Sequence, residues 1–244
     1  QLSKFNKIIK IDVENKFAVV QPGVVNLYLN QILKEYNLHF APDPSSQIVS
    51  TIGGNIAENA GGPHTLKYGV TTNHIIGQKV VLPDASVVNF GNALRCNNGY
   101  DFSSLFIGSE GTIGITTEIV VDLTSLPEIV KTFLMVFDNV AKATDMVSII
   151  LESGILPAAI EFMDKLCIHA VEKKLKAGYP IDANAVLLIE LDGNTDQVEY
   201  DTNKLKRIYS KHNDIPLIEA QNEKQRQKLW KGRKHAVGAL GLLS

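Results

Sequence analysis

The stretch from Ser50 to Gly69, STIGGNIAENAGGPHTLKYG, holds five glycines and few bulky apolar side chains. Such a segment adds little to a hydrophobic core, but glycine lets the backbone turn sharply or approach a ligand closely. A second cluster, GSEGTIGITTE, places Gly108, Gly111 and Gly114 among small polar residues. Two such segments indicate either tight chain reversals or a groove for a long ligand, and the residue types alone leave both interpretations open.

The polar residues of the first cluster are consistent with a cofactor that lies along the backbone. Successive exposed N–H groups form concavities that bind phosphate or pyrophosphate, and Thr51, Asn55 and Asn59 add hydroxyl and amide groups. Neither cluster is a G-x-G-x-x-G after a strand, and no GxxxxGK[ST] is present. A nicotinamide Rossmann site and a P-loop nucleotide site are therefore disfavoured.

Composition and charge narrow the class of protein. The chain has 244 residues, 45% hydrophobic and 20% charged, with a formal net charge of -2. This predicts a globular chain of one large or two modest domains, without a nucleic-acid or anionic-membrane partner. No apolar run approaches the roughly 20 residues that span a bilayer, and the N-terminal residues lack the apolar core of a signal peptide.

The cysteines and histidines predict neither disulfides nor a metal site. Cys96 and Cys167 are the only cysteines, without a CxxC spacing. The histidines include no pair at the i, i+3 or i, i+4 spacing and no HExxH motif. We therefore expect no metal and a reduced, cytoplasmic location, with peripheral attachment at the inner membrane left open.

The pattern of apolar residues changes about midway along the chain. The first half predicts a strand pair before Gly23, a helix capped by Asn26, and an antiparallel hairpin in IIGQKVVLPDASVVNFG. After Leu126–Pro127, strands such as AVLLIELDG alternate with amphipathic helices. We expect an α+β fold, with a sheet covered by helices on one face in the second half and a domain boundary at about Ser125–Glu128.

Long segments of the chain resemble one known family. APDPSSQIVSTIGGNIAENAGGPHTLKYG, GYDFSSLFIGSEGTIGITTEI, GILPAAIEFMD and LWKGRKHAVGALG resemble the vanillyl-alcohol-oxidase-type flavoproteins, which have a PCMH-type FAD-binding domain. This family includes the FAD-linked subunits of glycolate oxidases and the D-lactate and D-2-hydroxyglutarate dehydrogenases. The resemblance implies that residues 1–126 are the second part of an FAD-binding domain and that residues 127–244 are an incomplete ferredoxin-like cap (substrate) domain.

The resemblance also implies FAD as the cofactor and a set of residues around it. The segment PSSQIVST with Gly53–Gly54 would line the flavin and pyrophosphate, Glu58–Gly61 would contribute backbone groups, and Glu110–Thr116 would hold the adenosine end. The implied cofactor-binding residues are Pro42, Ser45, Ser46, Ser50, Thr51, Gly53, Gly54, Asn55, Glu58, Asn59, Ala60, Gly61, Gly69, Glu110, Gly111, Thr112, Gly114, Ile115 and Thr116.

One residue near the C-terminus is implied in substrate binding. In the related hydroxyacid dehydrogenases, an arginine three residues after a tryptophan binds the substrate carboxylate, and Arg233 follows Trp230 at this spacing. A guanidinium can meet a carboxylate with two parallel charge-assisted hydrogen bonds. The alternative is that Arg233, like Lys234 and His235, is one of several solvated cations.

The expected function is oxidation of a small 2-hydroxy acid, such as glycolate or D-lactate, to the 2-oxo acid with hydride transfer to the flavin. The family's N-terminal FAD subdomain and histidine-containing C-terminal segment are not found in this sequence, so the chain is expected to be a fragment, and its activity in isolation stays open. The alternatives are a non-catalytic split subunit or remnant that docks a partner chain, such as other subunits of a glycolate oxidase complex, and a structural domain without a ligand.

Overall fold

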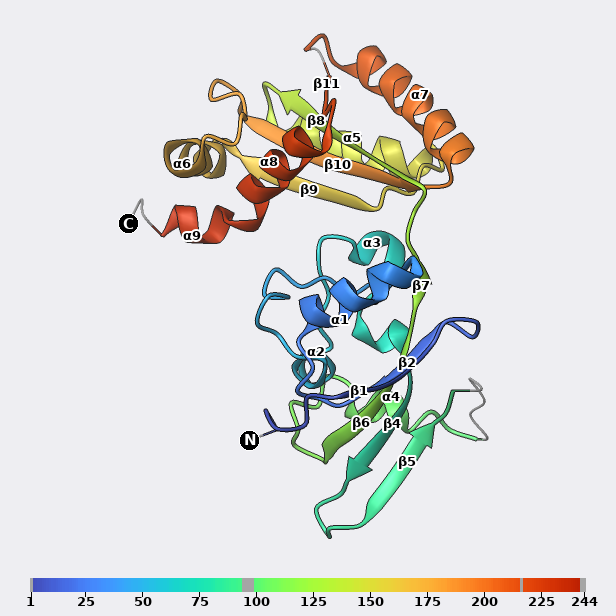
Figure 1. The fold of residues 1–244 in the computed structure, drawn as a ribbon. Helices are drawn as coiled ribbons and strands as arrows, with labels where there is room; N and C mark the ends of the chain where they lie inside the picture. Colours follow the sequence, from blue (N-terminus) through green and yellow to red (C-terminus); the bar gives the residue numbers. More distant parts are fainter. Residues whose placement is uncertain (1, 94–98, 216, 242–244) are drawn as a thin grey trace. The chain divides into compact units, whose positions relative to one another are not determined.

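The computed structural model describes residues 2–93, 99–215 and 217–241. The chain forms two compact units, Gln1–Leu126 and Pro127–Ser244 (Figure 1). Cys96, for which the sequence indicates an ordinary thiol, lies outside the described residues, whereas Cys167 is a partly buried free thiol.

An antiparallel five-stranded sheet in the order β1-β2-β6-β4-β5 frames the first unit. Its strands are β1 (Ile8–Asp12), β2 (Phe17–Val20), β4 (Ile75–Val81), β5 (Val87–Gly91) and β6 (Ile115–Asp122). The helices are α1 (Asn26–Leu33), α2 (Ile52–Glu58), α3 (Thr65–Tyr68) and α4 (Ser103–Phe106), with 3-10 turns η1 (Lys34–Tyr36) and η2 (Thr71–His74). A short ladder pairs β3 (Leu38–His39) with β7 (Thr124–Ser125). The predicted strand pair and hairpin are confirmed as β1–β2 and β4–β5.

The core of the first unit lies between the sheet and the helices α1 and α2. Buried side chains from β2, β6 and these helices form it: Ala18, Val20, Leu29, Leu33, Ile52, Ile56, Ile119 and Val121. The prediction that Asn26 caps α1 is wrong, because Val25 occupies the cap position. The Asn26 side chain is instead fully buried and donates to the Pro42 carbonyl at 2.9 Å. It thereby holds the loop that leads toward α2.

The second unit has the topology of a ferredoxin-like fold, which confirms the prediction for the cap domain. Its strands are β8 (Ile129–Phe137), β9 (Ala159–Asp164), β10 (Ala185–Gly193) and β11 (Ile218–Glu219), in the antiparallel order β11-β8-β10-β9. The chain runs β8-α5-β9-β10-α7-β11, the β-α-β-β-α-β sequence of that fold. The helices are α5 (Val140–Glu152), α6 (Lys165–Leu175), α7 (Thr195–His212), α8 (Glu223–Lys234) and α9 (Ala236–Leu240).

Helices cover both faces of this sheet, which corrects the expectation of one covered face. One face packs on α5 and α7, and the other packs on α6, α8 and α9 (Figure 1). Each face has its own hydrophobic core. Leu134, Val186 and Leu188 lie in the core under α6, α8 and α9, and Phe133 and Leu187 lie in the core under α5 and α7. A strand buried on both faces reads as a continuous apolar run, and FLMVF and AVLLIEL in β8 and β10 are such runs.

A buried carboxylate fixes α8 on the sheet. Glu190 of β10 is 2% exposed. Its Oε2 accepts hydrogen bonds from Thr132 Oγ1 at 2.7 Å and Trp230 Nε1 at 2.5 Å. Arg226 reaches both carboxylate oxygens, with Nε and Nη2 at 3.1 and 3.2 Å. Burial alone would lower the pKa of Arg226, but the Glu190 carboxylate outweighs burial and raises that pKa, so Arg226 stays charged.

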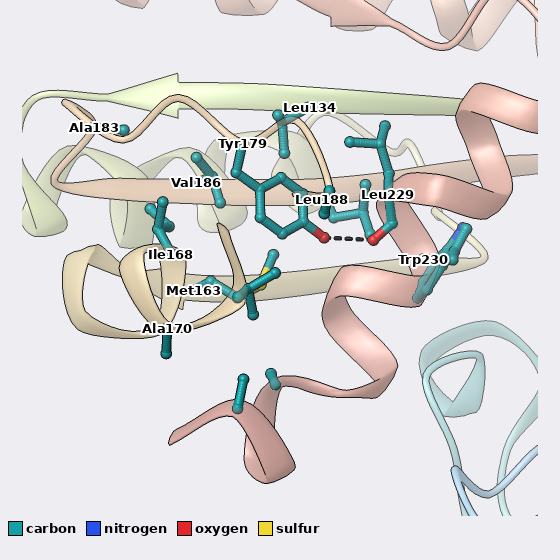
Figure 2. Packing of buried hydrophobic residues seen from close by; sticks show 14 of the residues in the cluster. Leu134, Met163, Ile168, Ala170, Tyr179, Ala183, Val186, Leu188, Leu229 and Trp230 are labelled. Atoms are coloured by element: carbon teal, nitrogen blue, oxygen red, sulfur yellow. Dashed lines mark hydrogen bonds between the residues drawn. The ribbon is translucent and has the colours of Figure 1, made fainter. Parts of the chain in front are cut away.

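A tyrosine and a glycine bring α8 close to its neighbours. The Tyr179 hydroxyl donates to the Leu229 carbonyl at 2.5 Å (Figure 2). Burial raises the pKa of Tyr179 and keeps this donor protonated. A β-carbon at Gly232 would lie 2.7 Å from Ala177 Cβ and 2.8 Å from the Tyr179 hydroxyl. Only glycine therefore permits this approach without a shift.

Replacing Glu190 by Ala should destabilise the second unit by about 3 kcal/mol, because it leaves a half-buried guanidinium and a buried indole N–H without their acceptor. Trp230 is the only tryptophan of the chain, so its fluorescence in a urea titration reports this transition. Glu190→Gln keeps an acceptor for Trp230 and should cost less. Equal urea midpoints for the parent and Glu190→Ala would refute the anchoring role of Glu190.

Candidate functional site

The two glycine clusters meet at a pocket in the first unit. The pocket has a volume of about 370 Å³. Its lining comes from the chain start, the turn before α1, the helix α2 with its cap residue Thr51, and the segment from the end of α4 to the start of β6. The lining residues are Leu2, Ser3, Pro22, Gly23, Thr51, Gly53, Gly54, Ile56, Ala57, Phe106, Ser109, Glu110, Gly111, Gly114, Ile115 and Thr116.

Backbone hydrogen bonds to the last turn of α2 hold the two clusters together. The N–H of Gly108 donates to the Ile56 carbonyl at 2.7 Å, and the N–H of Glu110 donates to the Ala57 carbonyl at 3.0 Å. Carbonyls in the last turn of a helix have no partner within the helix. The Ile56 carbonyl also accepts from Asn59 N–H at 3.1 Å. The second segment turns through positive φ angles here, 82° at Gly108, 52° at Glu110 and 71° at Gly111.

The amides at the start of α2 do not form the anion-binding concavity that the sequence predicts. Ile52 N–H donates to the Val24 carbonyl, Gly53 N–H to the Pro22 carbonyl, and Gly54 N–H to the Thr51 hydroxyl. The local reason is that the first turn of α2 is already capped and tied to the turn before α1. The N–H groups of Gly53 and Gly54 are thus already used within the protein.

Internal packing explains four of the five glycines between Ser50 and Gly69. A β-carbon would lie 2.5 Å from Pro22 at Gly53, 2.7 Å from Thr65 at Gly61, 2.2 Å from Asp43 at Gly62 and 2.4 Å from Asn73 at Gly69. Gly54 is different, because its β-carbon would meet only the Thr51 hydroxyl, at 3.4 Å. In the second cluster, a β-carbon at Gly111 would meet only Ile115 Cδ1, at 4.0 Å. At these two positions a side chain would enter the pocket.

The structure places the implied cofactor-binding residues in two groups. The residues in the pocket lining are Thr51, Gly53, Gly54, Glu110, Gly111, Gly114, Ile115 and Thr116. The residues outside it are Pro42, Ser45, Ser46, Ser50, Asn55, Glu58, Asn59, Ala60, Gly61, Gly69 and Thr112. Lining residues that the sequence analysis did not select are Leu2, Ser3, Pro22, Gly23, Ile56, Ala57, Phe106 and Ser109. Most of these are apolar or come from distant segments, so no local motif marks them.

Several implied residues outside the pocket hold neighbouring loops in place. The Asn59 side chain accepts from Thr72 N–H at 2.9 Å, and the Ala60 carbonyl accepts from Thr71 N–H at 3.0 Å. His64 Nδ1 lies 2.7 Å from Asp43 Oδ2, which ties the loop after Pro42 to the loop after α2. Asn55 Nδ2 and Ser50 Oγ are buried and have no hydrogen-bond partner among the described residues.

The pocket is apolar and nearly uncharged. Glu110 is the only ionisable residue in the described lining, and the apolar part includes Pro22, Ile56 and Phe106. No Lys, Arg or His lies among the described lining residues, so the pocket offers no positive side chain to balance a pyrophosphate. Its volume lies at the lower end of ligand pockets, about 300–1,000 Å³. The pocket therefore fits a neutral, flat ring of a dinucleotide better than its phosphates.

Arg233 lies in the second unit, in the last turn of α8. Its Nε donates to Glu161 Oε2 of β9 at 2.6 Å, and its side chain is 30% exposed. Burial and then Asp164 raise the pKa of the Cys167 thiol, whereas the positive charge of Arg233 lowers it. Arg233 is thus a half-buried, ion-paired residue, and the alternative of a freely solvated cation is wrong. Lys234 and His235 are exposed, as expected.

Two further observations concern metals and membranes. Among the residues that the structure describes, no group of three or more His, Cys, Asp or Glu side chains could hold a metal ion. None of the described helices combines the length and the apolar character that crossing a membrane requires.

The sequence matches two families of flavin enzymes. Residues 1–91 match the FAD binding domain, and residues 126–243 match the C-terminal domain of FAD linked oxidases. The chain is 42% identical over 243 residues to the glycolate oxidase subunit GlcD of Escherichia coli K12, covering 100% of this chain and 49% of that protein. It is 43% identical to GlcD of Bacillus subtilis, covering 98% of this chain and 51% of that protein.

A more distant relative and two solved structures extend the comparison. The chain is 32% identical to a mitochondrial D-lactate dehydrogenase [cytochrome] of Arabidopsis thaliana, covering 98% of this chain and 41% of that protein. An alkyldihydroxyacetonephosphate synthase superposes with a TM-score of 0.78 at 21% identity, covering 98% of this chain and 45% of the other. A substrate-bound p-cresol methylhydroxylase superposes with a TM-score of 0.74 at 19% identity, covering 93% of this chain and 50% of the other. These two structures share the fold.

The fold and the pocket thus define the vanillyl-alcohol-oxidase class of α+β flavoproteins. Within that class, the chain belongs to the FAD-linked oxidases of the glycolate oxidase and D-lactate dehydrogenase type, and FAD is the cofactor of this family. The chain spans about half the length of the curated relatives that it matches.

Substitutions at Gly54 should separate FAD affinity from stability. Gly54→Ala should leave the fold as stable or stabilise it by about 0.5–1 kcal/mol, since alanine favours the helix. Gly54→Leu should weaken FAD binding at least about tenfold, because its side chain would fill the pocket. Flavin fluorescence titration measures the affinity, and thermal unfolding measures the stability.

Gly53→Ala serves as the matched control, because its β-carbon would meet Pro22 at 2.5 Å. This variant should lose stability. If Gly54→Leu binds FAD with the parent affinity, FAD does not occupy this pocket.

Proposed function

We propose that the protein to which this chain belongs oxidises a small 2-hydroxy acid, such as glycolate or D-lactate, to the 2-oxo acid. The observation that carries this proposal is the pocket that stays free of side chains at Gly54 and Gly111, in a chain whose close relatives are glycolate oxidase subunits. The substrate is carried over from the names of those relatives and of a D-lactate dehydrogenase.

In this proposal the first unit binds part of the cofactor. Bound FAD would supply the acceptor for the hydride that leaves C2 of the substrate. Gly54 and Gly111 leave room for a ring, and Pro22, Ile56 and Phe106 cover it with apolar surface that excludes water. The Thr51 hydroxyl already accepts the cap bond from Gly54 N–H at 3.2 Å, so its own proton is available for a polar edge of the ligand.

In the same proposal the second unit binds the substrate. Arg233 binds the carboxylate with the paired N–H groups at the end of its guanidinium. Because the carboxylate is negative in substrate and product, this contact sets affinity and orientation and moves no proton. Residues 1–126 then serve as part of an FAD-binding domain and residues 127–244 as part of a substrate domain.

The partners and the location are further parts of the proposal. The relatives are named as subunits, which supports assembly of this protein with other subunits of a glycolate oxidase complex. A cytoplasmic location, with or without peripheral attachment to a membrane, stays a prediction.

Arg233→Lys tests the proposed carboxylate site. Lysine can keep the ion pair with Glu161 but cannot present two parallel N–H groups. We expect KM for glycolate or D-lactate to rise about 100-fold, which corresponds to about 2.7 kcal/mol, while FAD affinity stays unchanged. Steady-state kinetics on the flavin-loaded protein measures this effect, with an added redox dye as the electron acceptor and the loss of the dye's absorbance as the readout.

The neighbouring substitution Lys234→Gln is the control, because Lys234 is exposed. It should leave KM within about twofold of the parent value. A KM that does not change in Arg233→Lys would show that Arg233 does not bind the substrate. Failure of both 2-hydroxy acids to reduce the flavin would refute the proposed reaction.

A further inference from the structure

We propose that Glu161 is a positioning residue that orients the Arg233 guanidinium toward the substrate carboxylate. The inference rests on the proposed function, because it assumes that Arg233 binds the substrate. It adds a residue from another element, β9, to the recognition of the substrate.

The hydrogen bond between the two residues leaves the far end of the guanidinium available. Glu161 Oε2 accepts from Arg233 Nε at 2.6 Å, a short charge-assisted contact. The Glu161 side chain is 15% exposed and the Arg233 side chain 30% exposed. Within the described part of the chain, no hydrogen bond engages Nη1 or Nη2 of Arg233. These two nitrogens present parallel N–H groups, the geometry that a carboxylate accepts.

The sheet fixes the position of Glu161. Along β9, side chains alternate between the two faces, and Ala159 and Met163 are buried in the core under α6 and α8. Glu161 lies between them and therefore faces the same side. Its backbone pairs with Leu188 in β10, and Ala159 pairs with Glu190. Glu161 and Glu190 thus lie on adjacent strands, on the face that α8 covers.

The second carboxylate fixes the backbone of α8. Arg226, Trp230 and Arg233 lie on one side of the helix, at the i, i+4 and i+7 positions. The first two bind Glu190, and Gly232 packs against Tyr179 without room for a side chain. The main chain at Arg233 is therefore held in place. The remaining freedom is in the Arg233 side chain, and the contact with Glu161 restricts it.

This division of roles predicts which property of Glu161 matters. A carboxylate next to Arg233 cancels its charge and, by charge alone, would weaken the attraction of a substrate anion. Its benefit is to hold an otherwise mobile side chain in one orientation. A glutamine at this position keeps an oxygen acceptor for Nε and removes the charge, so it separates the two effects.

Steady-state kinetics with glycolate and D-lactate on the flavin-loaded protein tests the inference. We expect Glu161→Ala to raise KM about tenfold with kcat within about twofold, since orientation of the carboxylate affects bound substrate and transition state alike. Glu161→Gln should stay within about threefold of the parent KM. Oxalate, a dicarboxylate without an oxidisable C–H bond, gives an independent Kd through the shift that it causes in the flavin spectrum, and this Kd should follow KM.

Two controls separate positioning from stability. Glu199→Gln removes the carboxylate of a second 2.6 Å ion pair, with Lys131, on a helix that packs on the other sheet face, and it should leave KM unchanged. The urea midpoint from Trp230 fluorescence should be the same in Glu161→Gln as in the parent.

The outcomes distinguish this inference from the proposed function. If Arg233→Lys raises KM but Glu161→Ala does not, the positioning role is refuted while the carboxylate site stands. If Glu161→Gln loses as much affinity as Glu161→Ala, an oxygen acceptor at this position does not keep Arg233 in its binding orientation, and the positioning role as proposed is refuted. If Arg233→Lys leaves both KM and the oxalate Kd unchanged, the carboxylate site itself is refuted.

Discussion

The docking of residues 108–110 on the last turn of α2 determines the candidate cofactor site. Helix ends leave carbonyls without partners, and the amides of Gly108 and Glu110 supply them for Ile56 and Ala57. Gly108 and Glu110 have positive φ angles where they make these hydrogen bonds. A glycine in the second cluster therefore suits the backbone conformation that docking on α2 requires. The pocket is a consequence of this contact, because it brings together two segments about fifty residues apart in the sequence.

The sequence predicted the two glycine-rich segments, but it did not predict why each glycine is needed at its position. Glycine clusters are a local signal, so both segments could be found, as could the hairpin β4–β5 from its turn residues. The distinction between Gly54, which faces open space, and Gly53, which packs on Pro22, depends on a segment about thirty residues away. The amides at the start of α2 were expected to bind an anion, but the acceptors of Ile52 and Gly53 N–H, the carbonyls of Val24 and Pro22, lie in the same distant turn.

The same limit applies to the second unit. The apolar runs in β8 and β10 are typical of strands buried on both faces, but the alternation of strands and helices led to the expectation of only one covered face. The pairing of Glu161 with Arg233 was not visible, because it depends on the register of β9 against β10 and on the placement of α8. Glu190 lies within the run AVLLIELDG, and a carboxylate inside an apolar strand is the one local sign that a buried partner is required.

The two units differ in their use of charge, because the pocket of the first is nearly uncharged and the second contains partly buried ion pairs. In the first, the described pocket lining has Glu110 as its only ionisable residue, so affinity there comes from apolar contact and shape, which salt screens little. In the second, Glu190 and Glu161 hold charged groups of α8 at fixed positions. Each carboxylate forms an ion pair with a half-buried guanidinium. The attraction within each pair offsets the desolvation free energy of burying the two charges. Under the proposed function, Arg233 recognises an anion by the direction of its N–H groups, because Glu161 already balances its charge.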